Sequence, residues 1–237
     1  MPIPSCRSLV GRVLDVRTPH RATSPEVAVD GFGDLQAQYN LGVLYANGQG
    51  VEHDDAEAAR WYLKAAEQGF ALAQNNLGAY YDKGQGVEQD DTKAVYWYRK
   101  AAEQGLALGQ CNLAVMYEQS RGVKQDLSEA VNLYMKAAER GLALAQYNLG
   151  VLYMTGQGVQ HDDTEAVRWY LKAAEQGFAE AQNNLGAMYA QGLGVEQSWA
   201  MALAWYTKAA AQGNADAQSN LNRLKEIMTQ EALKKSA

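Results

Sequence analysis

Proline and cysteine are scarce in this sequence of 237 residues. The prolines are Pro2, Pro4, Pro19 and Pro25, so the chain beyond them lacks the residue that most strongly breaks helices. The two cysteines, Cys6 and Cys111, are far apart and predict neither a disulfide framework nor a metal-ligand cluster. This cysteine usage favours a reducing compartment. We expect a cytoplasmic protein, with a periplasmic or secreted location left open.

Positive charge and long apolar runs are also lacking. A formal net charge of −6 argues against nucleic acid and anionic membranes, since both need a basic face. No apolar run approaches the roughly 18 residues that a membrane-spanning helix needs, so we expect no membrane insertion. The first 30 residues carry four arginines and few acids. A transit peptide, a disordered tail and a remnant of a longer protein are the alternatives, and we expect residues 1–30 to be irregular or disordered.

Glycine recurs in the sequence at a fixed interval, and this spacing is the main feature of the chain. Similar stretches of about ten residues, such as GFALAQNNLG, follow each of these glycines. No insertion or deletion interrupts the period of 36 residues, which indicates tandem structural repeats. The glycines that define the period are Gly33, Gly69, Gly105, Gly141, Gly177 and Gly213.

Each repeat is predicted to contain two helices. The first, near residues 34–47, has apolar residues at helical spacing and ends at Gly48, where a left-handed residue costs glycine nothing. The second, near residues 55–68, begins at a capping box made by Asp54 and Glu57. The predicted buried stripe of this second helix consists of Ala58, Trp61, Tyr62, Ala65 and Ala66.

A helix pair of this length cannot bury its apolar face alone, so the repeats must stack on one another. The predicted fold class is all-α: an α/α superhelical solenoid of tandem 36-residue helix pairs. Residues 31–237 would form five full repeats and a C-terminal capping helix. Because the aromatic residues fill the seams between repeats, we expect Trp97→Ala to cost on the order of several kcal/mol. Ser120 stands where other repeats have glycine, and a left-handed backbone there would cost about 1 kcal/mol.

One repeat shows the motif that the others share. It consists of Ala37, Leu41, Gly42, Tyr45, Gly48, Gly50, Val51, Asp55, Ala58, Trp61, Tyr62, Lys64, Ala65, Ala66 and Gly69. This motif resembles the Sel-one-like repeat family, relatives of the tetratricopeptide repeats, and the near-identity of the copies is typical of bacterial proteins. The resemblance implies a superhelix with a concave face lined by the first helices, and a role as scaffold or adaptor.

Some members of that family carry one disulfide per repeat and have been described as β-lactamase-like. This chain lacks the paired cysteines, and it lacks the Ser-x-x-Lys motif that would supply a serine nucleophile, since Ser120 and Lys124 have the wrong spacing. The alternative function, a weak hydrolase or binder of β-lactam or peptidoglycan ligands, therefore rests on the resemblance only. We expect no enzyme activity, no catalytic residue and no cofactor.

An asparagine occurs at the same position of every repeat. An amide that both donates and accepts suits an extended peptide backbone, but it can equally hold neighbouring helices together. Both interpretations stay open. The row consists of Asn40, Asn76, Asn112, Asn148, Asn184 and Asn220.

The preceding position varies between repeats, as exposed contacts in a binding groove do. By analogy with tetratricopeptide domains we expect these residues to face the groove, together with the Val43 row one turn further on. Tyr147→Ala should then weaken a partner by about 1–3 kcal/mol with little change in fold, whereas Lys64→Ala should hardly matter. The predicted partner-binding residues are Tyr39, Asn75, Cys111, Tyr147 and Asn183, with Asn40, Asn76, Asn112, Asn148 and Asn184 beside them.

Two His-Asp-Asp triplets, at His53 and His161, resemble metal ligands. Gln89 replaces the histidine in the second repeat and the aspartates are needed as helix caps, so we predict no metal site. The sequence thus predicts a non-catalytic scaffold that holds a protein or peptide partner in its groove. Self-association through the N-terminal repeat is a further possibility.

Overall fold

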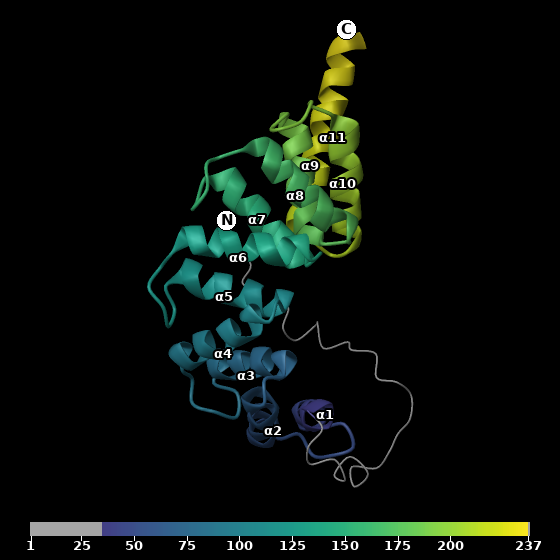
Figure 1. Ribbon diagram of the computed structural model, residues 1–237. Helices are drawn as coiled ribbons and strands as arrows, with labels where there is room; N and C mark the ends of the chain where they lie inside the picture. The colour runs from purple at the N-terminus through teal and green to yellow at the C-terminus, as the bar shows by residue number, and fades with distance from the viewer. Residues whose placement is uncertain (1–34, 237) are drawn as a thin grey trace. The chain divides into compact units, whose positions relative to one another are not determined.

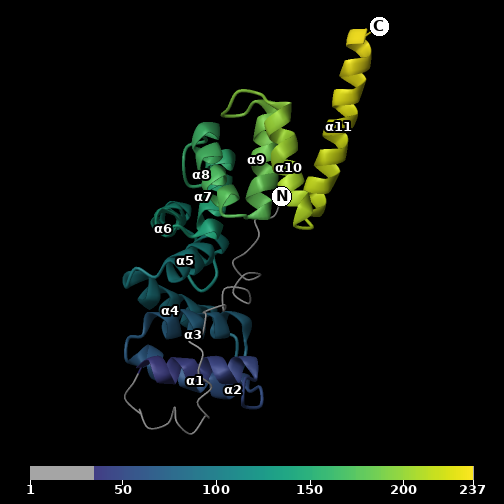
Figure 2. The same ribbon diagram turned by 90° about the vertical axis from the view of Figure 1, so that its right-hand side faces the viewer.

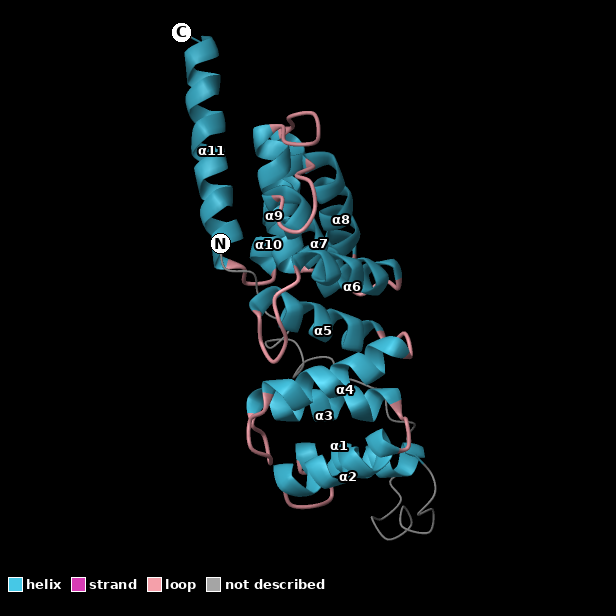
Figure 3. Ribbon diagram, turned by 60° about the vertical axis from the view of Figure 1, so that its left-hand side comes forward, coloured by secondary structure: helices cyan, strands magenta, loops and turns pink. Residues whose placement is uncertain are grey.

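The computed structural model describes residues 35–236, which fold into helices joined by short loops (Figures 1 and 3). No strand occurs within this range. The segment expected to be irregular, residues 1–30, lies outside the described residues. The helices are α1 (Leu35–Asn47), α2 (Asp55–Glu67), α3 (Ala71–Lys83), α4 (Asp91–Glu103), α5 (Ala107–Gln119), α6 (Leu127–Glu139), α7 (Ala143–Thr155), α8 (Asp163–Glu175), α9 (Ala179–Gln191), α10 (Trp199–Ala211) and α11 (Ala215–Ser236).

The helices confirm the predicted repeat. Helix α1 begins and ends within one residue of the expected range 34–47, and α2 does so for 55–68. The odd-numbered helices are the first helices of the pairs and the even-numbered ones are the second helices. The prediction of an all-α repeat fold is therefore correct.

The chain divides into two compact units, with the boundary between Leu133 and Tyr134 inside α6. In unit 1, α1 packs on α2 and α3 on α4, while α2 contacts α3 and α4 contacts α5. In unit 2, α7 packs on α8 and α9 on α10, and α10 also contacts α11. The second half of α11 extends beyond its neighbours (Figure 2).

The second helices begin at side-chain caps, but only half of the predicted capping box forms. The Asp54 carboxylate accepts hydrogen bonds from the backbone N–H groups of Ala56 and Glu57, at 2.9 and 3.0 Å. The reciprocal bond from Glu57 is replaced, because the Asp54 N–H donates to the Tyr45 carbonyl and Glu57 pairs with Arg60. The tight loop thus satisfies the Asp54 donor from the preceding helix.

The first helices end in a left-handed residue, as glycine spacing predicts. Gly84 closes α3 with φ +68°, and its N–H donates to the Tyr80 carbonyl. Ser120 takes the same conformation at the end of α5, with φ +56°, and is the one non-glycine residue with positive φ among residues 35–236. This confirms the strained backbone expected at Ser120.

Tyrosine rings of the second helices lie directly on glycines of the first helices. A Cβ atom added to Gly78 would lie 2.7 Å from the Tyr98 ring, and Gly42 and Tyr62 show the same distance. Tyr98 is 1 % exposed, whereas Trp97, expected to be buried in the seam, is half-buried. The expectation for Trp97 is therefore corrected: the tyrosine that follows it fills the core.

Glutamines that the sequence analysis did not single out connect the repeats. Gln74 is buried and its Nε2 donates to the Ala66 carbonyl near the end of α2, at 3.1 Å. Its Oε1 accepts a 2.7 Å bond from Gln104, the residue that follows α4 in the same helix pair. In unit 2, Gln146 and Gln176 repeat this arrangement. These bonds add a second donor to the Ala66 and Ala138 carbonyls, which also accept from the N–H groups of Gly69 and Gly141.

Candidate functional site

The variable position before the asparagine row is buried, which corrects the expectation that it faces a groove. A side chain this buried offers a partner almost no surface and packs against its own helices instead. Tyr147, for example, lies between the rings of Tyr170 and Phe178, and burial raises its pKa to about 12. The buried residues are Tyr39, Asn75, Cys111, Tyr147 and Asn183.

Tyr147→Ala is consequently expected to damage the fold, contrary to the expectation from sequence, because it removes a buried ring. Lys64 is not a free lysine either. Its ammonium lies 3.8 Å from the centre of the Trp61 ring, a cation–π contact on the outer face of α2.

The asparagine row makes hydrogen bonds between successive first helices. In unit 1, Asn112 Nδ2 donates to Asn75 Oδ1 at 2.9 Å, and in unit 2 Asn220 does the same to Asn183. These bonds join the row to the variable position of the preceding repeat. They favour the structural interpretation of the row.

Where the variable position holds tyrosine, the asparagine bonds to hydroxyl groups. In unit 1, Asn76 bonds to the hydroxyl groups of Tyr39 and Tyr62. In unit 2, Asn184 bonds to Tyr147 in the same way. Burial nevertheless raises the pKa of Tyr62 above its ordinary value, so the hydroxyl stays protonated. Within residues 35–236, the amide of Asn148 is buried without a hydrogen-bond partner.

Some of the first helices, α1 among them, present a partly exposed stripe that includes the predicted positions Asn40 and Val43, whereas the same positions of α5 and α7 are buried. On α1 it consists of Gln36, Asn40, Val43 and Asn47, spaced by four, three and four residues. Its outer rows, those of Gln36 and Asn47, vary between repeats: position 47 becomes Lys83, Gln119, Thr155, Gln191 and Ile227. Gln36 and Asn47 are 11 residues apart and therefore lie on the same face of the helix. Variation at both positions is the signal that would have identified the stripe from the sequence.

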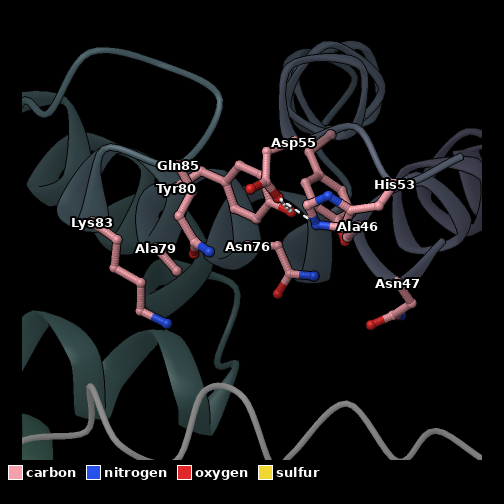
Figure 4. A pocket seen from close by; sticks show the side chains of 10 residues that line it. Ala46, Asn47, His53, Asp55, Asn76, Ala79, Tyr80, Lys83 and Gln85 are labelled. Carbon is pink, nitrogen blue, oxygen red and sulfur yellow. Dashed lines mark hydrogen bonds and ion pairs between the residues drawn. The ribbon is translucent and has the colours of Figure 1, made fainter.

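A polar pocket of about 140 Å³ opens on this stripe in unit 1 (Figure 4). It lies between α1, α2 and α3, with Ala46 and Asn47 from α1 and Asn76 and Lys83 from α3. Asp55, at the start of α2, supplies its carboxylate. The stacking of the repeats creates the pocket, because it places the C-terminal end of α1 beside α3, the first helix of the next repeat.

The Asp55 carboxylate has two neighbours in the pocket wall. The Tyr80 hydroxyl donates to Asp55 Oδ1 at 3.2 Å, and His53 Nε2 lies 3.5 Å from the same oxygen. Burial and the negative charge nearby raise the pKa of Tyr80, so its hydroxyl remains a donor. In Figure 4 the Lys83 side chain ends on the side of the pocket away from Asp55.

The equivalent place one repeat further along holds an ion pair. Arg121, which takes the register position of Gln85, donates to the carboxylates of Asp82 and Asp91. The Asp82 side chain is 9 % exposed and that of Arg121 is 17 % exposed. Asp91 starts α4 as Asp55 starts α2. The chain's own guanidinium therefore occupies the place that is open in the first repeat.

The described residues offer little for metal binding or catalysis. Among residues 35–236, no group of three or more His, Cys, Asp or Glu side chains could hold a metal ion. His53 and His161 each lie beside one aspartate only, Asp55 and Asp163. Ser120 is exposed, and its hydroxyl donates to the Val123 carbonyl at 3.5 Å. No helix of the described range has the length and apolar character to cross a membrane.

The repeats match a known family over most of the chain. The family model of the Sel1 repeat matches five consecutive segments, residues 35–70, 71–106, 107–142, 143–178 and 179–214. The chain belongs to the Sel1 repeat family. This confirms the resemblance drawn from the motif. Sel1 repeat proteins are typically non-catalytic scaffolds for protein interactions.

Solved structures of Sel1 repeat proteins have the same fold. A protective antigen of uropathogenic Escherichia coli with an SLR fold is 40% identical, with a TM-score of 0.78 over 83% of this chain. This chain spans only 42% of that protein's length. A Sel1 repeat protein from Oxalobacter formigenes is 36% identical, with a TM-score of 0.76 over 85% of this chain and 87% of the other. An immunity protein from Pseudomonas aeruginosa is 25% identical, with a TM-score of 0.51 over 84% of this chain and 74% of the other. No curated protein matches the chain.

Proposed function

We propose that this Sel1 repeat protein is a non-catalytic scaffold that binds a protein or peptide partner on the exposed stripe of its first helices. The observation that carries the proposal is the polar pocket on this stripe in unit 1. Packing uses up most of the remaining surface of the first helices: on α3, eight of 13 residues are buried. The stripe is therefore where these helices keep side-chain surface exposed to a partner.

The outer faces of the second helices support the assignment by contrast. On α2, the exposed Arg60 pairs with Glu57 three residues earlier, and on α8 Arg168 pairs with Glu165. Exposed pairs of this kind keep a helix face solvated and contribute little to stability. The pocket instead gathers amide, imidazole and carboxylate groups from three helices and two loops. Converging polar groups of this kind are typical of recognition sites.

The proposal is tested by capturing partners from a bacterial lysate on two matched variants. Asn47→Trp places a large side chain at the mouth of the pocket, whereas Lys64→Trp places it on the outer face of α2. We expect Asn47→Trp to reduce recovery of specific partners about tenfold or more, measured by quantitative mass spectrometry, and Lys64→Trp to leave it unchanged. Equal recovery on both variants would contradict the assignment.

The hydrolase alternative is tested with the purified chain and nitrocefin. We expect no turnover above the rate of a heat-denatured sample. Turnover that Asn47→Trp abolishes would place β-lactam chemistry in the pocket and contradict a scaffold function.

A further inference from the structure

The pocket in unit 1 and the Arg121 ion pair occupy the same place in two successive repeats. Positions 36 residues apart are equivalent in successive repeats. Ala46 therefore corresponds to Asp82, Asp55 to Asp91 and Gln85 to Arg121. The backbone at these positions corresponds as well, since Asp55 and Asp91 are both the first residues of second helices. The second interface therefore shows what kind of group the first interface can accommodate.

In the second interface two of the three guanidinium nitrogens are hydrogen-bonded, while Nη1 of Arg121 is buried without a partner. Arg121 Nε donates to Asp91 Oδ2 at 3.2 Å, and Nη2 donates to Asp91 Oδ1 and Asp82 Oδ1. The two parallel bonds to Asp91 form the bidentate geometry in which a planar guanidinium matches a carboxylate. Asp91 is the first residue of α4, and its equivalent in the first interface is also an aspartate, Asp55. Both interfaces therefore have a carboxylate at this position.

In the first interface the carboxylate is kept, but the guanidinium is missing. Gln85, which lines the pocket, is shorter than arginine and carries no charge, and the methyl group of Ala46 replaces the Asp82 side chain. The two replacements correspond to a cavity of about 140 Å³ beside Asp55. Asp55 is held in place by the Tyr80 hydroxyl and by His53, so its position does not depend on a guest (Figure 4).

We propose that this pocket binds the guanidinium of an arginine side chain on a partner peptide, in the place that Arg121 occupies one repeat further along. The inference rests on the proposed scaffold function and names the chemistry of the partner. An arginine is favoured over a lysine because the fork of the guanidinium can bond to both oxygens of a carboxylate, whereas an ammonium acts as a point charge. The backbone of the same peptide lies beside Asn47 and Asn76, which line the pocket.

Two basic residues line the same pocket and oppose a cationic guest. His53 already contacts Asp55, and the amine of Lys83 lies on the far side of the pocket from Asp55 (Figure 4). The equivalents of Lys83 in the third and fifth repeats are Gln119 and Gln191. Lys83→Gln therefore removes a repelling charge with a side chain that the repeat tolerates. We expect it to tighten arginine binding by about three- to tenfold at low salt.

The test uses the full chain and four capped tripeptides, Ac-Gly-Xaa-Gly-NH2, in which Xaa is arginine, citrulline, lysine or glutamate. Citrulline has the shape of arginine without its charge. Binding is followed by NMR through the side-chain amide signals of Asn47, Asn76 and Gln85. We expect saturable shifts with the arginine peptide, about tenfold weaker binding for lysine and citrulline, and none for glutamate. Equal binding of citrulline and arginine would overturn the proposal.

Three variants locate the site. Asp55→Asn removes the carboxylate, and Asp163→Asn is its matched control in unit 2. Because Asp55→Asn can also disturb the start of α2, the double variant Ala46→Asp/Gln85→Arg provides an independent test, since it fills the pocket with the chain's own arginine. We expect Asp55→Asn and the double variant to lose the arginine-induced shifts, and Asp163→Asn to keep them.

Unchanged binding to the double variant would overturn the proposal even if Asp55→Asn failed to fold. The proposed scaffold function would survive that result if Asn47→Trp still reduced partner capture. Loss of both effects would contradict the scaffold function as well.

Discussion

Two successive interfaces of unit 1 share one backbone arrangement but differ in what fills them. Between α3, α4 and α5, Arg121 joins Asp82 and Asp91 within the protein. Between α1, α2 and α3, the same positions leave a polar pocket. Ala46 and Gln85 stand in the first interface where Asp82 and Arg121 stand in the second, and Tyr80 stands where the second has Met116. A repeat protein can thus convert a structural contact into a binding site without changing its fold.

Unit 2 shows a third way to fill the same place. Met154 occupies the register position of Ala46, and its sulfur accepts a hydrogen bond from the Tyr170 hydroxyl at 3.7 Å. Met188 replaces Tyr80, so Asp163 has His161 beside it, at 3.2 Å, but no tyrosine. Met154 is larger than Ala46, and its flexible side chain can fill volume that is open in the first repeat.

The largest expected effect is a loss of stability when the buried tyrosine that both interfaces of unit 1 contain is removed. Tyr62→Ala and Tyr98→Ala each remove a ring that is 1 % exposed and packed on a glycine. We expect each variant to lower the free energy of unfolding by about 3–5 kcal/mol, measured by urea denaturation. Tyr96→Ala is the control, because Tyr96 is 51 % exposed and should cost less than about 0.5 kcal/mol. A large difference between Tyr62 and Tyr98 would mean that the interfaces are not equivalent.

The second prediction separates the filled interface from the open one. Arg121→Gln copies the side chain of the first interface into the second and leaves the carboxylate of Asp82 buried without its cation. We expect a loss of about 2–4 kcal/mol in the free energy of unfolding, because an uncompensated buried charge is costly. Arg168→Gln breaks an exposed pair on α8 and should cost less than about 1 kcal/mol. Equal effects would show that Arg121 is only a surface residue.

A smaller effect is expected from the backbone beside that ion pair. Ser120 is left-handed with φ +56°, where the other first helices of the five repeats end in glycine. Ser120→Gly should raise the free energy of unfolding by about 1 kcal/mol, since glycine adopts this conformation without steric cost. The matched change, Gly84→Ser, should lower it by a similar amount. A destabilised Ser120→Gly variant would mean that the Ser120 hydroxyl contributes more than its long contact suggests.

The repeat and its helices are predictable from the sequence because they follow from spacing. Glycines every 36 residues locate the helix ends, and Asp54 locates the start of α2, where its side chain caps two backbone donors. The packing of aromatic pairs is less predictable. Trp97 and Tyr98 are adjacent and similar in character, yet Tyr98 packs on Gly78 and is buried while Trp97 is half-buried. In unit 2 the equivalent Trp169 is buried together with Tyr170.

The candidate site is predictable only in part. The asparagine row is visible in the sequence, but its bonds to the preceding repeat depend on the distance between neighbouring first helices. Variation misled the prediction at Tyr39, because packing tolerates tyrosine, asparagine and cysteine at this buried position. The pocket could not be predicted, since Ala46 and Gln85 belong to different repeats and come together only when these repeats stack.

The measurement that tests the account most directly is a double-mutant cycle on the open interface. Ala46→Asp and Gln85→Arg are made singly and together, and the free energy of unfolding of each variant is compared with the parent chain. If the pocket is the unfilled counterpart of the Arg121 site, the two substitutions should stabilise each other. The free energy of unfolding of the double variant should then be about 1–3 kcal/mol higher than the two single changes predict when added. A coupling energy near zero would show that an arginine cannot reach Asp55 in this pocket and would contradict the account.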